Sequence, residues 1–124
     1  MKFNPGYITN KLSESKEFYC KYLGFTVKFE NEFYILLENA NSIGSFEISF
    51  LLPNHPSQNK IFQPGYQSGS YLTIEVDSIE KEYYRITGLG CKIWMETKDE
   101  EWGDRHFIIK DPNGLGIDIV QYGN

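Results

Sequence analysis

The chain has 124 residues, of which 40% are hydrophobic and 16% are aromatic, and its formal net charge is −5. Its lysines and arginines are scattered and form no basic stripe, which argues against a nucleic-acid partner and favours a neutral or cationic small molecule. No apolar run approaches the roughly 18 residues of a membrane span and the N-terminus has no apolar leader, so we expect a cytoplasmic protein. The two cysteines, Cys20 and Cys91, form no CxxC pair and are expected to be free thiols.

The first half of the chain predicts one strand, one helix and three further strands. A short strand at 6–9 precedes a helix that starts near Ser13, and Gly24 stands where a helix end needs a positive φ. Apolar residues recur at helical spacing along this helix: Leu12, Phe18, Tyr19, Tyr22 and Leu23. Alternating apolar residues between Asn, Gly and Pro then predict strands at 25–30, 32–38 and 45–52.

The second half repeats this order. KEFYCKYLGFTVKFE (residues 16–30) resembles KEYYRITGLGCKIWME (residues 81–96), at an offset of about 65 residues. A strand at 71–76 precedes the second helix, for which Asp77 and Glu80 suggest a capping arrangement and Gly88 or Gly90 a stop. Further strands are predicted at 91–97, 105–111 and 116–122. The sequence between the halves, residues 54–69, is rich in Pro, Gly, Ser, Asn and Gln and is predicted to be an exposed linker.

Three segments carry a resemblance to a known family: LSESKEFYCKYLGF, VDSIEKEYYRITGLG and EWGDRHFIIKDPNGLGIDIVQY. In this order and at these spacings the chain resembles the vicinal oxygen chelate (VOC) superfamily, which includes glyoxalase I, extradiol dioxygenases, and fosfomycin and bleomycin resistance proteins. The resemblance implies an α+β fold in which two βαβββ modules form a curved mixed sheet around a cleft.

The implied organisation is a single VOC domain over residues 1–124, with module one at about 3–53, a linker at about 54–69 and module two at about 70–122. The resemblance also implies that Asp111-Pro112-Asn113-Gly114 is a structural turn, in which Pro fixes φ and Gly adopts a conformation closed to other residues. Asp111 is therefore interpreted as a turn former and not as a catalytic residue.

Enzymes of the superfamily hold a divalent ion with two histidines and one or two acids. The resemblance places Asn4, Glu47, Tyr71 and Asp118 nearest these positions, so both imidazoles are replaced. Asn is a poor ligand for transition metals, and Tyr would need deprotonation far below its usual pKa of about 10. We therefore expect no cofactor and no native catalytic metal, although a weak divalent metal on the two remaining carboxylates stays open.

Neither histidine falls at a ligand position. His55 lies in the polar linker and is interpreted as a solvated loop residue. His106 begins the strand before the turn, and we interpret it as a surface or hydrogen-bonded residue.

The leading functional hypothesis follows from the resemblance to bleomycin resistance proteins, which are acidic, metal-free dimers that hold a cationic drug in aromatic-lined grooves. It predicts a cytoplasmic homodimer that binds a cationic or aromatic small molecule and serves antibiotic resistance or toxin sequestration. No catalytic residue is assigned. The predicted ligand-binding residues are Glu47, Ser49, Tyr71, Trp102 and Asp118.

Other interpretations stay open at this point. Trp102 either stacks on the ligand or covers the end of the barrel. Strand alternation puts Glu47 and Ser49 on one face of a strand, and Asp118 on one face with Val120, but both acids also suit a solvated face. Glu47 could instead form a structural ion pair with Arg105. At the level of function, the alternatives are a metal-dependent lyase or dioxygenase-like enzyme with unusual ligands, and a partner-binding module without a small ligand.

Overall fold

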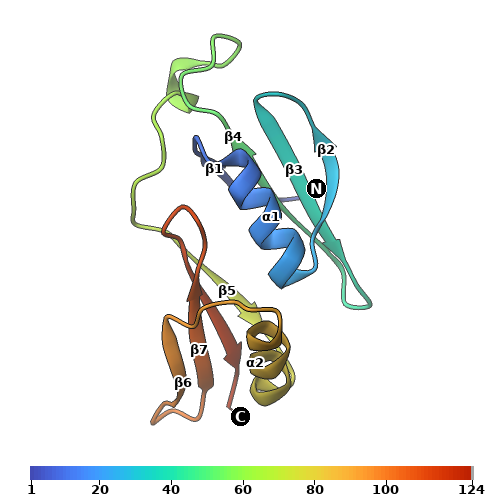
Figure 1. The fold of residues 1–124 in the computed structure, drawn as a ribbon, viewed down its shortest axis with the longest axis vertical. Helices are drawn as coiled ribbons and strands as arrows, with labels where there is room; N and C mark the ends of the chain where they lie inside the picture. The colour runs from blue at the N-terminus through green and yellow to red at the C-terminus, as the bar shows by residue number, and fades with distance from the viewer. Residues whose placement is uncertain (124) are drawn as a thin grey trace. The chain divides into compact units, whose positions relative to one another are not determined.

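The computed structural model describes residues 1–123 and divides the chain into two compact units of the same architecture. In the structure, module one comprises residues 1–67, which include most of the predicted linker, and module two begins at Ser68. Each contains one strand, one helix and three strands in that order (Figure 1). The two mixed sheets have the strand orders β1-β4-β3-β2 and β5-β8-β7-β6. The α+β fold with two βαβββ repeats, predicted from the sequence, is therefore confirmed.

The elements of module one are β1 (Gly6–Ile8), α1 (Leu12–Leu23), β2 (Thr26–Glu30), β3 (Tyr34–Ala40) and β4 (Ser45–Leu51). The helix begins at Leu12, before Ser13, because its first hydrogen bond runs from the backbone N–H of Ser15 to the carbonyl of Lys11 at 3.0 Å. It ends at Gly24, which has a φ of 71° and donates its N–H to the carbonyl of Tyr19. The predicted glycine stop is thus confirmed, while the predicted start lies one residue too late.

One face of the first sheet is covered by α1 and forms the core of module one. Ile48 and Phe50 of β4 are buried there together with Tyr19 of the helix, whose ring lies 5.4 Å from that of Phe50. Because side chains alternate along a strand, the neighbours Glu47 and Ser49 lie on the opposite face. We call the face of each sheet that its helix does not cover the helix-free face.

The elements of module two are β5 (Tyr71–Glu75), α2 (Ile79–Gly88), β6 (Met95–Asp99), β7 (Arg105–Lys110) and β8 (Gly116–Gln121). The predicted cap of α2 is wrong by one residue: the hydroxyl of Ser78 accepts the N–H of Lys81 at 3.3 Å. Glu80 is instead paired with Arg105. The strand predicted at 91–97 starts only at Met95, because Cys91 is still bonded to the end of the helix through the carbonyl of Ile86.

The core of module two repeats that of module one. Ile79 and Ile86 of α2 are fully buried against the covered face of the sheet, which presents Phe107, Ile109, Ile117 and Ile119. The strand register places His106 beside Val120, and Asp118 beside Ile108 and Thr73. His106 and Asp118 therefore share the helix-free face of module two.

The linker is more ordered than its composition predicts. It contains the short 3-10 helix η1 (Lys60–Phe62), and the backbone N–H of Tyr66 donates to the carbonyl of Ile8 at 2.7 Å, which fastens the linker to β1. His55 is not a simple solvated residue, because its ring stacks on Phe33 with 3.9 Å between centroids. Local hydrogen bonds that composition does not reveal thus give this segment a fixed course.

Two simple expectations can be compared with the described residues. Cys20 is half-buried and Cys91 is buried, and both are free thiols as predicted. Within residues 1–123, no helix combines the length and the hydropathy that crossing a membrane requires.

Candidate ligand-binding site

The helix-free face of module one holds three of the predicted site residues. The Glu47 carboxylate accepts a hydrogen bond from the Lys28 ammonium at 2.5 Å, and the Ser49 hydroxyl donates to the Asn4 side-chain oxygen at 3.3 Å. The hydrogen bond from Lys28 holds the pKa of Glu47 below its ordinary value, against the opposing effect of desolvation. Glu38 lies 3.8 Å from the same ammonium. A carboxylate pair bridged by one lysine therefore occupies this face.

The suggested ion pair between Glu47 and Arg105 is wrong. Arg105 is paired with Asp99, at 2.6 Å, and with Glu80, both within module two. These hydrogen bonds and charges, above all from Asp99, raise the pKa of the guanidinium. Arg105 thus joins β7 to the start of α2, and the counter-ion of Glu47 is Lys28.

The helix-free face of module two contains a histidine held between two carboxylates. Nδ1 of His106 lies 2.6 Å from Oδ1 of Asp118, and Nε2 lies 2.8 Å from Oε2 of Glu100. Desolvation by itself would lower the pKa of His106, but the hydrogen bonds to Asp118 and Glu100 outweigh it, so the pKa is raised. The interpretation of His106 as a hydrogen-bonded residue is confirmed. We call these three residues the histidine clamp.

Two predicted aromatic residues stand exposed on module two. Trp102, in the loop between β6 and β7, is 69% exposed, and its indole N–H donates to Asp104 at 2.8 Å. The other carboxylate oxygen of Asp104 accepts the N–H of Gly123 at 2.9 Å, which fixes the loop to the end of the described chain. Tyr71 is 75% exposed and lies on β5, two residues before Thr73, the neighbour of Asp118. Both rings are free to meet a ligand.

The predicted site residues thus form two groups. Asn4, Glu47 and Ser49 lie together on module one, and Tyr71 and Asp118 lie on the helix-free face of module two. A cleft in which Glu47 and Asp118 contact the same ligand stays a prediction.

Asp111 has the structural role that was predicted. Its side chain is buried, and one carboxylate oxygen accepts the backbone N–H groups of Asn113 at 2.8 Å and Leu115 at 2.9 Å. Gly114 has a φ of 79°, which a residue with a β-carbon rarely adopts. The four residues close the hairpin between β7 and β8 and leave no free carboxylate oxygen for chemistry on this turn.

The donor groups do not match those of a divalent-metal centre. Nowhere in residues 1–123 do three or more His, Cys, Asp or Glu side chains come together in a way that could hold a metal ion. The Glu47 carboxylate is held by an ammonium, and the Asp118 carboxylate by an imidazole. Asn4 is a poor ligand for transition metals, and the Tyr71 hydroxyl would have to lose its proton before it could bind one.

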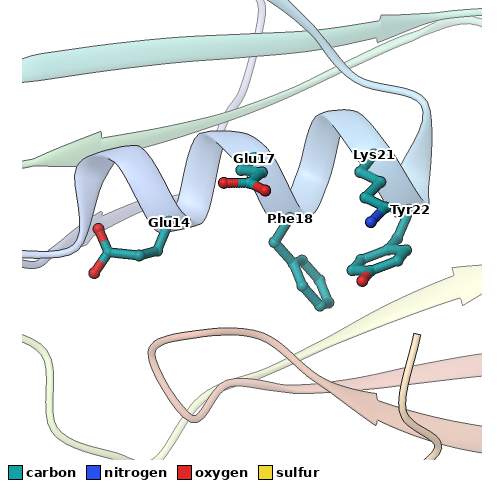
Figure 2. A pocket seen from close by; sticks show the side chains of 5 residues that line it. All are labelled: Glu14, Glu17, Phe18, Lys21 and Tyr22. Atoms are coloured by element: carbon teal, nitrogen blue, oxygen red, sulfur yellow. The ribbon is translucent and has the colours of Figure 1, made fainter. Parts of the chain in front are cut away.

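A separate depression of about 230 Å³ lies on α1 and is lined by Glu14, Glu17, Phe18, Lys21 and Tyr22. Figure 2 shows the rings of Phe18 and Tyr22 projecting from the same side of the helix, and their centroids are 5.1 Å apart. None of the predicted ligand-binding residues lines this depression, so we do not assign the ligand to it.

Sequence reasoning missed Lys28 and Glu100. Lys28 lies at a β-bulge, because Val27 pairs with Leu37 while Phe29 pairs with the adjacent Leu36. A bulge redirects side chains and breaks the alternation from which faces are predicted. The contact between His106 and Asp118 could have been predicted from the sequence, because an antiparallel hairpin around the 111–114 turn puts both residues on one face.

Comparison with known proteins places this fold in a family. The model of the Glyoxalase/Bleomycin resistance protein/Dioxygenase superfamily matches residues 5–119. A comparison with curated protein sequences gives no match.

Solved structures of low sequence identity share the fold. A glyoxalase/bleomycin resistance protein/dioxygenase from Nocardioides has a TM-score of 0.81 at 16% identity, over 100% of this chain and 84% of that one. A bleomycin-binding protein complexed with bleomycin has a TM-score of 0.69 at 18% identity, over 98% of both chains. A lactoylglutathione lyase from Agrobacterium tumefaciens has a TM-score of 0.76 at 12% identity, over 98% of this chain and 92% of that one. With a family match over nearly its whole length, the chain belongs to the Glyoxalase/Bleomycin resistance protein/Dioxygenase superfamily.

Proposed function

We propose that this protein is a cytoplasmic, metal-free binder that sequesters a cationic or aromatic small molecule such as an antibiotic or a toxin. The observation that carries the proposal is the exposure of Trp102 and Tyr71 on the module that holds Asp118. An exposed aromatic ring beside a carboxylate offers stacking and charge to the same organic cation. The net charge of −5 adds a long-range attraction for such a ligand.

The similarity in fold to a bleomycin-binding protein supports this proposal. The proposed contacts are Trp102 and Tyr71 for stacking, Glu47 and Asp118 for charge, and Ser49 for a hydrogen bond. We further propose that the protein acts as a homodimer.

The donor set favours binding over metal-assisted catalysis. Each of the two acids at the ligand positions already faces a basic side chain, Lys28 or His106. A metal ion would have to displace that side chain before it could bind, which costs the hydrogen bond and its charge. The metal-dependent enzyme alternative therefore requires Glu47 and Asp118 to give up their basic partners first.

The first experiment is a calorimetric titration of the protein with bleomycin, followed by a screen of aromatic amines. Replacing Trp102 with Ala is expected to weaken binding about tenfold, because stacking over a cation contributes on the order of 1 to 2 kcal/mol and 1.4 kcal/mol is one decade in Kd.

The matched control is Trp94→Ala. Trp94 is also an exposed Trp of module two, but its ring is already covered by the Lys110 ammonium at 3.7 Å from the centroid. This variant should keep the Kd of the parent protein. If Trp94→Ala and Trp102→Ala weaken binding equally, the proposed stacking site is wrong, and a protein that binds neither bleomycin nor any aromatic amine refutes the proposed function.

A further inference from the structure

The histidine clamp has a geometry that only one charge state of the ring satisfies. Both ring nitrogens of His106 lie within hydrogen-bond distance of a carboxylate oxygen, at 2.6 Å from Asp118 and 2.8 Å from Glu100. A carboxylate only accepts hydrogen bonds, and a neutral imidazole has a single N–H to donate. Two such contacts at once therefore require the imidazolium, which donates from both nitrogens.

Loss of the proton changes the charge of this face. In the neutral ring, one nitrogen presents a lone pair to a carboxylate oxygen, so one of the two contacts becomes repulsive. The ammonium of Lys98 lies 3.2 Å from Glu100. With His106 protonated, two cations balance the two carboxylates; with His106 neutral, one negative charge is left uncompensated.

Within residues 1–123, the strand register assigns no second imidazole to this face. Beside the clamp and Lys98, the ionisable side chains that the strand register assigns to this face are Lys110 on β7 and Tyr71 and Glu75 on β5, with Tyr122 following β8. The helix α2 packs on the opposite face, where Glu80 pairs with Arg105. In the register, the neighbours of His106 are Val120 and Lys98. His106 is thus the group of the clamp that changes charge near neutral pH.

The carboxylate of module one has a counter-ion of a different kind. Its carboxylate, Glu47, is held by Lys28, whose pKa is raised above its ordinary value, first by the hydrogen bond to Glu47. This ammonium stays charged throughout the neutral range, so the compensation of Glu47 is permanent. The compensation of Asp118 is conditional, because an imidazole titrates near neutral pH.

We propose that His106 is an internal counter-ion that competes with a cationic ligand for Asp118 and Glu100, so that the protein binds organic cations tightly when His106 is neutral and weakly when it is charged. The inference rests on the proposed function, since it takes Asp118 as a ligand contact. It assigns to His106 a role in selecting the charge of the ligand. The ligand class is an amidine or an amine that presents N–H donors to the carboxylates that the imidazolium otherwise occupies.

The raised pKa of His106 sets the range in which this competition acts. By linkage, a cation that binds the neutral form must lower the pKa of His106, and the Kd of the cation must fall as pH rises through that pKa. For one coupled proton, the change approaches about tenfold per pH unit on the acidic side and levels off above the pKa.

The test uses benzamidine, an amidinium that keeps its charge over the whole range from weakly acidic to weakly alkaline pH. Its Kd is measured by calorimetry across this range, and the imidazole protons are followed by NMR with and without benzamidine. The chain has only two histidines, so His55 serves as the internal reference. We expect the titration of His106 to shift to lower pH when benzamidine is bound, while that of His55 stays where it is in the absence of benzamidine.

Three variants separate competition from a purely structural role. His106→Gln should bind benzamidine with a pH-independent Kd, whereas His55→Gln should keep the parental pH profile. Glu100→Gln removes the negative charge from one acceptor of the imidazolium, so the midpoint of the profile should move to lower pH. A merely structural role of His106 would change the affinity but would not move this midpoint.

Several results would overturn the inference: a parental Kd that does not vary with pH, a pH profile that survives in His106→Gln, or no benzamidine binding at any pH. Failure of this inference is distinguishable from failure of the proposed function. Bleomycin that binds with a pH-independent Kd would retain the function and remove the role of His106. Benzamidine that binds as expected, in a protein that binds no bleomycin, would retain that role and remove sequestration of this drug.

Discussion

Asp111 is a carboxylate with a structural role, which follows from its hydrogen-bond partners. It is buried, and it accepts the N–H groups of Asn113 and Leu115 in the hairpin between β7 and β8. Glu47 and Asp118, in contrast, face basic side chains on the helix-free faces. The partner therefore distinguishes the three acids: backbone N–H groups indicate a turn, and a side-chain cation indicates a surface where a ligand could exchange with it.

Replacing Asp111 with Ala should reduce the free energy of unfolding by about 1 to 3 kcal/mol, because two backbone donors in a mostly buried turn lose their acceptor. Asp111→Asn keeps an acceptor oxygen and should cost less. The measurement is urea denaturation followed by circular dichroism. Asp77→Ala is the control, since Asp77 is exposed and Ser78 caps the helix instead, and it should change stability by less than about 0.5 kcal/mol. A comparable loss in Asp77→Ala would restore the cap predicted from the sequence.

The site could be predicted from the sequence only in part. Alternation along β4 and β8 correctly separates Glu47 and Asp118 from the core residues beside them. What alternation does not give is the partner of each acid. The partner of Glu47 is set by a bulge in β2, and that of Asp118 depends on the exact register of a hairpin, because a slip by one residue reverses the face of His106.

Among the elements, helix ends were predicted better than strand starts. Gly24 marks the end of α1 because only a residue without a β-carbon enters its backbone conformation at little cost. The start of β6 was missed, since Cys91 to Trp94 read as strand but the first of them is bonded to the end of α2. The linker is largely exposed, as predicted, but its fixed course is set by hydrogen bonds to specific carbonyls that composition does not reveal. A glycine at a helix end can be predicted from the local sequence pattern. The start of β6 and the course of the linker depend instead on contacts with other elements.

Gly24→Ala should reduce the free energy of unfolding by about 1 to 2 kcal/mol, because a β-carbon is strained at a φ of 71°. Gly88→Ala is the matched control: Gly88 also lies at a helix end, but it has no left-handed φ and an added β-carbon there meets nothing within 4 Å. It should be neutral or stabilising by up to about 1 kcal/mol. Thermal and urea denaturation of both variants measure the difference, and equal losses would show that backbone strain is not the cause.

For the whole molecule, the repeat gives two sheets of identical strand order, each with a charged cluster on its helix-free face. Module one holds its acid with a lysine, and module two holds its acid with a histidine. Two modules of the same architecture thus compensate the charge of their carboxylates with different basic side chains. The protein is also predicted to form a homodimer. Sedimentation at micromolar concentration that detects only a 14.4 kDa species would refute this prediction.

The melting temperature should be unchanged by EDTA, because the acids at the ligand positions are compensated by Lys28 and His106 and no metal-binding free energy is coupled to folding. Differential scanning fluorimetry with and without chelator provides the measurement. Dialysis against Mn²⁺, Ni²⁺ or Zn²⁺ is the complementary arm. A melting temperature that falls by several degrees in EDTA and recovers with one of these ions would revive the metal-dependent alternative.

The bulges have a consequence for how copies of the chain meet. The register shifts in β2, at Lys28, and in β6, between Met95 and Lys98, and each of these strands is the last in its sheet. An irregular edge strand with charged side chains pairs poorly with a strand of another copy. The bulges therefore oppose open-ended aggregation. Deleting one residue to remove either bulge would give a regular edge strand that can pair with a second copy of the chain. Fibril formation would then compete with folding.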